Sequence, residues 1–165
     1  IQLNKVKVVY DKPIYIGFCV LDLSKYHMYG FYYDFIKPMY GDRVKLLYGD
    51  TDSYICEIQT DNLYNDIKQN LDVFDTSNFE TNNQFGIINH NKAVLGKFKD
   101  ECSGKLIKEF IGLRSKMYSI VVEDKNIKKA KGIKKNVVAN EITHNDFKSV
   151  LLQNSRIMRE QVVFR

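Results

Sequence analysis

Two apolar, strand-forming runs around an acidic tip constrain this sequence more than any other feature. Residues 44–48 and 54–58 are apolar and rich in strand-forming side chains, and residues 49–53 separate them. Runs of this length joined by a short segment of turn-forming residues predict a β-hairpin. We therefore expect Asp50 and Asp52 to lie at the tip of a two-stranded ribbon.

The two aspartates of the tip are candidate metal ligands. Carboxylates one residue apart project to the same side of an extended chain, and the neighbouring Gly49 leaves room for a tight turn or a ligand. With no basic residue between them, Asp50 and Asp52 repel each other unless a cation lies there. Mg²⁺ prefers one or two carboxylates together with phosphates, which is typical of nucleotidyl-transfer sites. The spacing alone also fits an Asx-stabilised turn with no metal.

The remaining patterns predict an α+β chain with a mainly antiparallel sheet. Apolar residues recur every three or four positions over 16–36, which predicts a helix buried on more than one side and bracketed by Pro13 and Pro38. Next we expect a short helix capped by Asp61, an irregular segment over 75–91, and strands at 93–98, 106–113, 116–122 and 128–133. Thr143 should begin a helix with Phe147, Val150 and Leu151 facing inward.

Charge is distributed unevenly along the chain. Residues 1–90 carry 8 Lys and Arg against 12 Asp and Glu, whereas residues 91–165 carry 17 against 8. An acidic half suits bound divalent metal, and a basic half suits a polyanion whose condensed counterions are released on contact. The same charges also fit two solvated surfaces without a ligand.

Composition and cysteine usage exclude other classes of protein. No run of about 18 apolar residues occurs, so no membrane span is expected. Cys19, Cys56 and Cys102 lack the spacing of a disulfide framework or a zinc site, and we expect them to be buried as small hydrophobic residues. No secretory leader is found, so a reducing location in the nucleus or cytoplasm is expected, without secretion. Because position 1 is not methionine, we expect a piece of a longer polypeptide.

The string around the tip resembles motif C of family B DNA polymerases, in which YGDTDS joins two strands. It reads Lys45-Leu46-Leu47-Tyr48-Gly49-Asp50-Thr51-Asp52-Ser53-Tyr54. The resemblance implies that Asp52 bridges two catalytic Mg²⁺ ions and that Asp50 is a supporting acid. Both are therefore candidate catalytic and metal-binding residues. Tyr48, Gly49, Thr51 and Ser53 would support the motif, the last two by packing or hydrogen bonding beneath the turn.

Two basic segments resemble DNA-contacting elements of the same family. Residues 114–118, Arg-Ser-Lys-Met-Tyr, look like its K-x-Y element, and a period of two places Arg114, Lys116 and Tyr118 on one strand face. Residues 129–132, Lys-Ala-Lys-Gly, are similar to the K-x-K-G segment with which protein-primed members enter the thumb. By spacing alone, they also fit a half-exposed strand and a solvated loop. The DNA-binding residues that the resemblance implies are Arg114, Lys116, Tyr118, Lys129, Lys131 and Gly132.

The wider resemblance extends over roughly residues 13–154. Strings at 21–25, 74–77, 96–101 and 109–114 look like polymerases of large self-synthesising transposons and related animal viruses. This implies a palm-type antiparallel sheet with flanking helices, a partial palm over 1–123 and the start of a thumb over 124–165. Primer-template DNA, a dNTP and a terminal protein primer are the implied partners. Motif A, with the other metal-bridging aspartate, and motif B, which holds the triphosphate, are not found.

Three functions remain open from the sequence. The resemblance implies a fragment of a DNA-directed DNA polymerase that transfers a nucleotide from dNTP to a primer 3′ end by two-metal catalysis, inactive alone without motifs A and B. The alternative is a non-catalytic, degenerate or domesticated remnant that binds nucleic acid non-specifically, which stop codons directly upstream would indicate. The third is a basic nucleic-acid-binding domain of other ancestry, which the core-like spacing of the aromatic residues disfavours.

Overall fold

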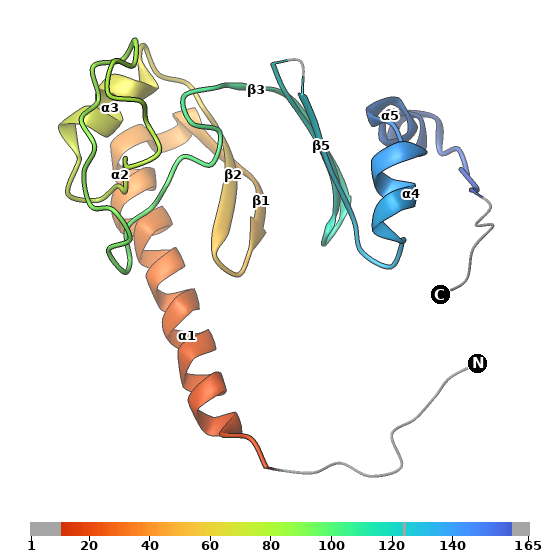
Figure 1. The fold of residues 1–165 in the computed structure, drawn as a ribbon, viewed down its shortest axis with the longest axis horizontal. Helices are drawn as coiled ribbons and strands as arrows, with labels where there is room; N and C mark the ends of the chain where they lie inside the picture. Colours follow the sequence, from red (N-terminus) through yellow and green to blue (C-terminus); the bar gives the residue numbers. More distant parts are fainter. Residues whose placement is uncertain (1–10, 124, 160–165) are drawn as a thin grey trace. The chain divides into compact units, whose positions relative to one another are not determined.

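The computed structural model describes residues 11–123 and 125–159. It combines helices with antiparallel sheets, so the predicted α+β class is confirmed. Two compact units, residues 1–60 and 61–165, divide the chain (Figure 1). The first contains α1 (Ile14–Gly30), a π-helix (Phe31–Ile36), α2 (Lys37–Tyr40), a 3₁₀ turn (Gly41–Arg43), β1 (Val44–Asp50) and β2 (Ser53–Ile58). The second contains α3 (Leu63–Gln69), β3 (Ile107–Arg114), β4 (Met117–Val122), β5 (Lys125–Ala130), α4 (Lys135–Asn140) and α5 (His144–Gln153).

The helical path of the first unit continues past Pro38, so the prediction that this proline lies beyond the helix is wrong. A proline ring crowds the carbonyl four residues earlier and offers no amide hydrogen to it. The six residues before α2 widen into a π-helix, whose hydrogen bonds span five residues, and Pro38 then occupies the first turn of α2. The path ends at Gly41, whose φ of 59° favours glycine.

Most of α1 is exposed. The core of the first unit lies at Ile36, Tyr40 and Val44, where the π-helix and α2 meet the hairpin. Within α1, Met28 is the one buried residue, whereas Phe18 and Tyr26 are 64% and 78% exposed. The prediction of a helix buried on more than one side is therefore wrong for the described residues, because a single hairpin cannot cover it. None of the helices in the described ranges is long and apolar enough to cross a membrane.

The second unit begins with a loop-rich module around α3. Asn62, and not the predicted Asp61, caps this helix, because its side-chain oxygen accepts hydrogen bonds from the amides of Tyr64 and Asn65, each at 3.1 Å. The module's core is formed by Tyr64, Ile67, Phe79 and Ile87.

Residues 75–91 are irregular, as predicted, but the strand predicted at 93–98 is not formed. Ala93 and Gly96 have φ values of 57° and 78°, which an extended strand cannot accommodate. The segment forms turns, and Phe98 makes an isolated bridge to Phe74.

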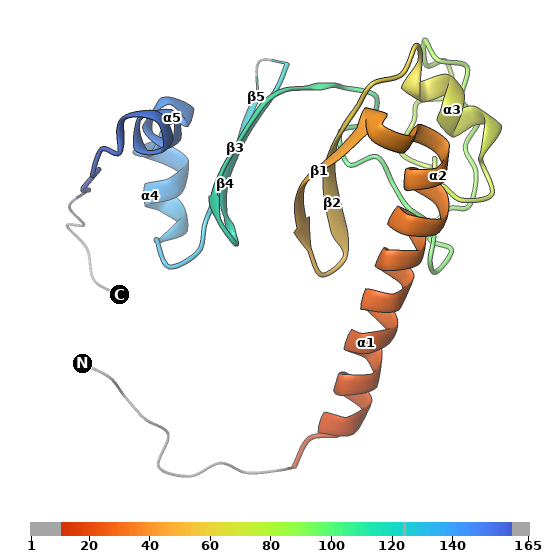
Figure 2. The same ribbon diagram turned by 180° about the vertical axis from the view of Figure 1, so that it is seen from behind.

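A three-stranded antiparallel sheet in the order β3-β4-β5 follows. The strands predicted at 106–113 and 116–122 correspond to β3 and β4, whereas the one predicted at 128–133 begins and ends earlier, as β5. Helices α4 and α5 cover one face of the sheet (Figure 2). The apolar cluster on that face is Ile111, Ala130, Val137, Val138, Ile142 and Phe147. The boundary at 123/124 falls between the paired strands β4 and β5, and the division into palm and thumb stays a prediction.

Helix α5 begins where the sequence predicts, and α4 is an additional helix that the sequence pattern does not reveal. Thr143 and Asp146 form a reciprocal capping box at the start of α5. Phe147 is buried as predicted and Val150 is half-buried. Leu151, predicted to face inward, is 54% exposed, because it lies one residue beyond the stripe that contacts the sheet.

Polar contacts fix α4 and α5 to the sheet. The Nδ1 atom of buried His144 lies 2.8 Å from Ser119 Oγ on β4, and its Nε2 atom lies 3.2 Å from Glu109 Oε2 on β3. The Lys128 ammonium donates to the carbonyls of Ala139 and Ile142, at 3.0 and 2.6 Å. Lys128 thereby satisfies carbonyls at the end of α4 that lack helical partners.

Asp75 ties the loop module together and titrates at unusually low pH. Its buried carboxylate accepts the amides of Ser77 and Ala93, at 2.9 and 3.2 Å, and lies 3.2 Å from Lys99 Nζ. Hydrogen bonds from Ser77, then Lys99 and Ala93, lower the pKa of Asp75 well below its ordinary value, although burial opposes the shift. Because its folded-state pKa is lowered, the Asp75 carboxylate stabilises the fold at pH values above its unfolded-state pKa of about 3.9. This stabilisation is lost as the pH falls through the folded-state pKa.

We expect Asp75→Asn to lower the free energy of unfolding at pH 7 by about 1–3 kcal/mol, because a charged acceptor of several buried donors is lost. The difference from the unchanged chain should shrink as pH falls below about 4, where the aspartate contribution declines. Urea unfolding at pH 7 and pH 3 measures both. Asp72→Asn, at an exposed position three residues earlier, is the matched control and should change little; an equal effect of both variants would contradict the role of Asp75.

Candidate functional site

The acidic hairpin is formed as predicted. Strands β1 and β2 pair antiparallel from Val44 opposite Ile58 to Asp50 opposite Ser53, with a bulge between Leu46 and Tyr48. Only Thr51 and Asp52 connect the two strands. The motif therefore occupies the end of a ribbon, with Asp50 half-buried as the last residue of β1 and Asp52 exposed in the turn.

The tip turns through a strained residue. Thr51 has a φ of 56°, which is unusual for a β-branched residue. The Asp52 amide donates to the Asp50 carbonyl across it, as in a three-residue turn. The chain is not extended at Thr51. The prediction that Asp50 and Asp52 project to the same side of an extended chain is therefore wrong.

Short-range hydrogen bonds hold this turn. The hydroxyl of Thr51 donates to Asp50 Oδ1 and that of Ser53 donates to the Asp50 carbonyl, each at 3.4 Å. From α1, the hydroxyl of Ser24 donates to the Thr51 carbonyl at 3.3 Å. Sequence reasoning missed Ser24, because it lies 27 residues from its partner and no local pattern links the two.

Gly49 makes room for an aromatic ring. It pairs with Tyr54 across the hairpin, and a Cβ at position 49 would lie 3.1 Å from two carbons of the Tyr54 ring. The expectation that Gly49 opens a tight turn or a ligand space is therefore wrong: Tyr54 fills that space. The Tyr54 ring also meets Tyr32 edge-on at 5.8 Å, and burial, with smaller contributions from neighbouring tyrosines, raises the pKa of its phenol. Half-buried Tyr48 lies beside Gly49 on β1.

The two aspartates fit part of a magnesium site. Carboxylate oxygens are the donors that Mg²⁺ prefers, and protein sites for it commonly use one or two carboxylates with substrate phosphates. Across residues 11–123 and 125–159, no group of three or more acidic, histidine or cysteine side chains is arranged to hold a metal ion.

A second candidate site, which we call the basic edge, comprises Arg114, Lys116, Tyr118, Lys129, Lys131 and Gly132 in the second unit. Arg114 ends β3, Ser115 and Lys116 form the turn, and Tyr118 belongs to β4. The prediction that Arg114, Lys116 and Tyr118 share one face of a single strand is therefore wrong. A two-residue hairpin turn interrupts the alternation, and Lys116 adopts a φ of 57° within it.

The sheet nevertheless brings the two basic segments together. The Lys131 amide donates to the Lys116 carbonyl at 2.9 Å, directly after the last strand pair, Met117 opposite Ala130. Gly132 follows with a φ of 98°, and a Cβ at this position would meet no atom within 4 Å, so the backbone there is open. Segments 114–118 and 129–132 thus form one continuous end of the sheet.

Tyr118 and Lys129 lie on the face opposite α4 and α5. They are direct cross-strand partners, and the Lys129 ammonium lies 6.0 Å from the centroid of the Tyr118 ring, at the limit of a cation–π contact. Phe110 flanks the same ring at 6.1 Å. In the described part of the chain, no ion pair engages Arg114, Lys129 or Lys131, whereas Lys148 and Lys105 are paired with glutamates. These cations therefore keep their charge available to a polyanion.

The three cysteines are less buried than predicted. Cys56 and Cys102 are half-buried and unbridged, and burial raises the pKa of the Cys56 thiol to about 11. Cys19 is exposed, because it lies on the uncovered α1, so the expectation of burial is wrong for this residue.

Comparisons with protein-family models, with curated proteins and with solved structures found no match to this chain.

The strain at Thr51 can be tested by substitution. Thr51→Asn should stabilise the hairpin by about 1 kcal/mol, because asparagine tolerates a positive φ better than a β-branched residue. Hydrogen exchange of the β1 and β2 amides measures the change as slower opening. Thr81→Asn is the control, an exposed turn position whose φ is not positive. Faster exchange in Thr51→Asn, or equal slowing in both variants, would argue against strain at the tip.

Proposed function

We propose that this chain is part of a family B DNA-directed DNA polymerase, comprising the second half of the palm with motif C and the start of the thumb. The observation that supports this most is the hairpin, since YGDTDS comprises the end of β1, the turn and the start of β2, with Asp50 and Asp52 at the tip. A D-x-D spacing alone is weak evidence, but the motif needs this strand–turn–strand context.

The basic edge gives separate support. The K-x-Y and K-x-K-G segments lie apart in the sequence, yet the Lys116 carbonyl and the Lys131 amide are hydrogen-bonded. Cations, a phenol and an open glycine backbone on one sheet end can follow a phosphate backbone without reading bases. In this proposal Arg114, Lys116 and Lys131 hold phosphates, and Tyr118 with Lys129 packs along the primer-template.

The exposed surface of α1 suits a segment of a larger enzyme. A helix that exposes Phe18, Leu23 and Tyr26 is costly for a free-standing domain, because a large apolar patch contacts water. Further palm and fingers structure would cover α1 and supply motifs A and B. The terminal protein primer would be a partner of the complete enzyme.

In the proposed reaction, the primer 3′ hydroxyl attacks the α-phosphate of a dNTP and pyrophosphate leaves. Asp52 would hold both Mg²⁺ ions, with Asp50 as a supporting acid. Bound Mg²⁺ would supply charge stabilisation on the attacking and leaving oxygens. The chain's own contribution is to fix Asp52 at a rigid tip, through the hydrogen bonds of Thr51, Ser53 and Ser24, and to hold the duplex at the basic edge.

A non-catalytic remnant that binds nucleic acid is the second candidate. It rests on the basic edge alone, because cations on one sheet end can hold a polyanion without a metal. Both candidates share the basic edge and differ only in catalysis.

Activity separates the two candidates. The purified chain should not extend a primer with Mg²⁺ and dNTPs, because motifs A and B are missing. When it replaces the equivalent segment of a complete polymerase of this family, the segment should support primer extension. Asp52→Asn in this graft should abolish extension and leave DNA binding nearly unchanged, because the substitution removes a metal ligand and no phosphate contact. Gel-based primer extension and fluorescence anisotropy measure the two. An active Asp52→Asn graft would refute the assignment.

DNA binding by the isolated chain tests the basic edge. We expect weak, sequence-independent binding to primer-template DNA, with a Kd of about 10⁻⁴ to 10⁻⁶ M at physiological salt. The slope of log affinity against log salt should be near −3 to −4, for about 0.9 per neutralised phosphate. Lys131→Ala and Lys116→Ala should each flatten the slope by about one unit.

Lys108→Ala is the matched control for this experiment. It removes the same charge from the same sheet, but at the start of β3, away from the basic edge. Anisotropy across a salt series should therefore give an unchanged slope. If all three lysine variants behave alike, overall charge and not the basic edge governs binding.

A further inference from the structure

Ser24 is the position at which the exposed helix α1 meets the acidic tip. Residues 14–27 of this helix are exposed, except for Ser24, which is half-buried. Its hydroxyl donates to the Thr51 carbonyl at 3.3 Å, although the two residues lie 27 positions apart in the sequence. The residue of this stretch that is partly withdrawn from solvent is therefore the one that is hydrogen-bonded to the turn.

The Ser24 hydroxyl acts on a strained part of the turn. Thr51 has a φ of 56°, and a negative φ would relieve its side chain. The Thr51 carbonyl and the Asp52 amide belong to one planar peptide unit, so a donor that holds the carbonyl also fixes the direction of the amide. That amide donates to the Asp50 carbonyl. Because a change of φ in a two-residue turn reorients the adjacent peptide units, the hydrogen bond from Ser24 opposes relaxation of the tip.

We propose that Ser24 is a positioning residue for Asp52 and thereby sets the Mg²⁺ requirement of the tip. This rests on the proposed function, in which Asp52 is a metal ligand. The hydroxyls of Thr51 and Ser53 donate to Asp50, whereas Ser24 holds the peptide unit that leads into Asp52. If this unit were released, a bound ion would first have to order the turn, and its affinity would fall.

Hydrogen exchange of the Asp52 amide, measured by NMR on the full 165-residue chain, tests the positioning without a metal. Ser24→Ala should speed up this exchange about two- to tenfold, which is the usual effect of one hydrogen bond. Alanine is a better helix former than serine, so α1 itself should not weaken, and circular dichroism checks this. Ser24→Thr keeps a hydroxyl and should exchange slowly. Equal exchange in Ser24→Ala and the unchanged chain would overturn the positioning role.

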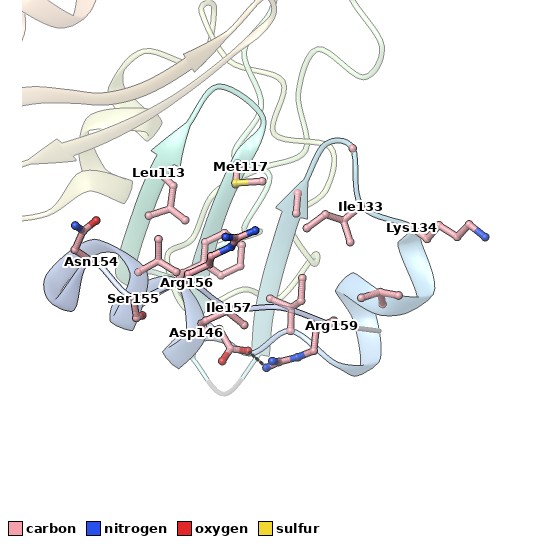
Figure 3. Close-up of a pocket in the computed structure, with 16 residues that line it drawn as sticks. Leu113, Met117, Ile133, Lys134, Asp146, Asn154, Ser155, Arg156, Ile157 and Arg159 are labelled. Carbon is pink, nitrogen blue, oxygen red and sulfur yellow. Dashed lines mark hydrogen bonds and ion pairs between the residues drawn. The ribbon is translucent and has the colours of Figure 1, made fainter. Parts of the chain in front are cut away.

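Ser155→Ala is the matched control. Ser155 is also half-buried, but it lies in the segment after α5, in the second unit (Figure 3). Its hydroxyl oxygen has no hydrogen-bond partner among the described residues. Exchange of the Asp52 amide should therefore stay as in the unchanged chain. Equally fast exchange in both serine variants would indicate a general loss of stability and would contradict a specific role of Ser24.

The Mg²⁺ dependence of primer extension in the graft tests the consequence for the metal. Ser24→Ala should raise the Mg²⁺ concentration for half-maximal extension about two- to tenfold, and Ser24→Thr should restore it. The change should fall mainly on this concentration and less on the rate at saturating Mg²⁺, which a general structural defect would also lower. An unchanged Mg²⁺ dependence in Ser24→Ala, with Asp52→Asn inactive, would refute the positioning role alone. An active Asp52→Asn graft would refute the proposed function instead.

Discussion

The second unit depends on the burial of one face of its sheet against α4 and α5. Ile111 and Ala130 lie in one apolar cluster with Phe147. Because strand side chains alternate, burial of this face commits Tyr118 and Lys129 to the opposite face. His144 adds direction, since its contacts with Ser119 and Glu109 require one orientation of α5. The arrangement of the basic edge therefore depends on the apolar cluster on the other face of the sheet, although the residues of the basic edge are not members of that cluster.

The hairpin of the first unit is governed by a different constraint, the fit of an aromatic ring over a glycine. Tyr54 occupies the space above Gly49 and connects the ribbon to the tyrosines of the helix before it. Ser24 on α1 donates a hydrogen bond to the carbonyl of the tip residue Thr51, and Thr51 adopts a conformation that its side chain disfavours.

Local patterns predicted the elements that have their own signals. The hairpin was recognisable from two apolar runs and turn residues, and α5 from Thr143 ahead of apolar residues at helical spacing. The strand predicted at 93–98 failed because apolar composition does not report φ. The helix end at Pro38 failed because proline fits the first turn of a helix, where Pro38 lies in α2. The prediction placed Lys116 on a strand because the turn at Ser115 and Lys116 contains no glycine or proline. The sequence pattern therefore gives no sign that a strand ends there.

The sequence by itself determined the acidic tip between two strands, the concentration of basic residues in the second half, and the start of α5. Only the tertiary structure decided which lysines remain available. Lys128 donates to carbonyls at the end of α4, whereas its neighbour Lys129 lies over Tyr118 on the opposite face. Adjacent lysines are equivalent in composition and charge, but strand alternation gives them opposite faces, and packing decides which face meets helices.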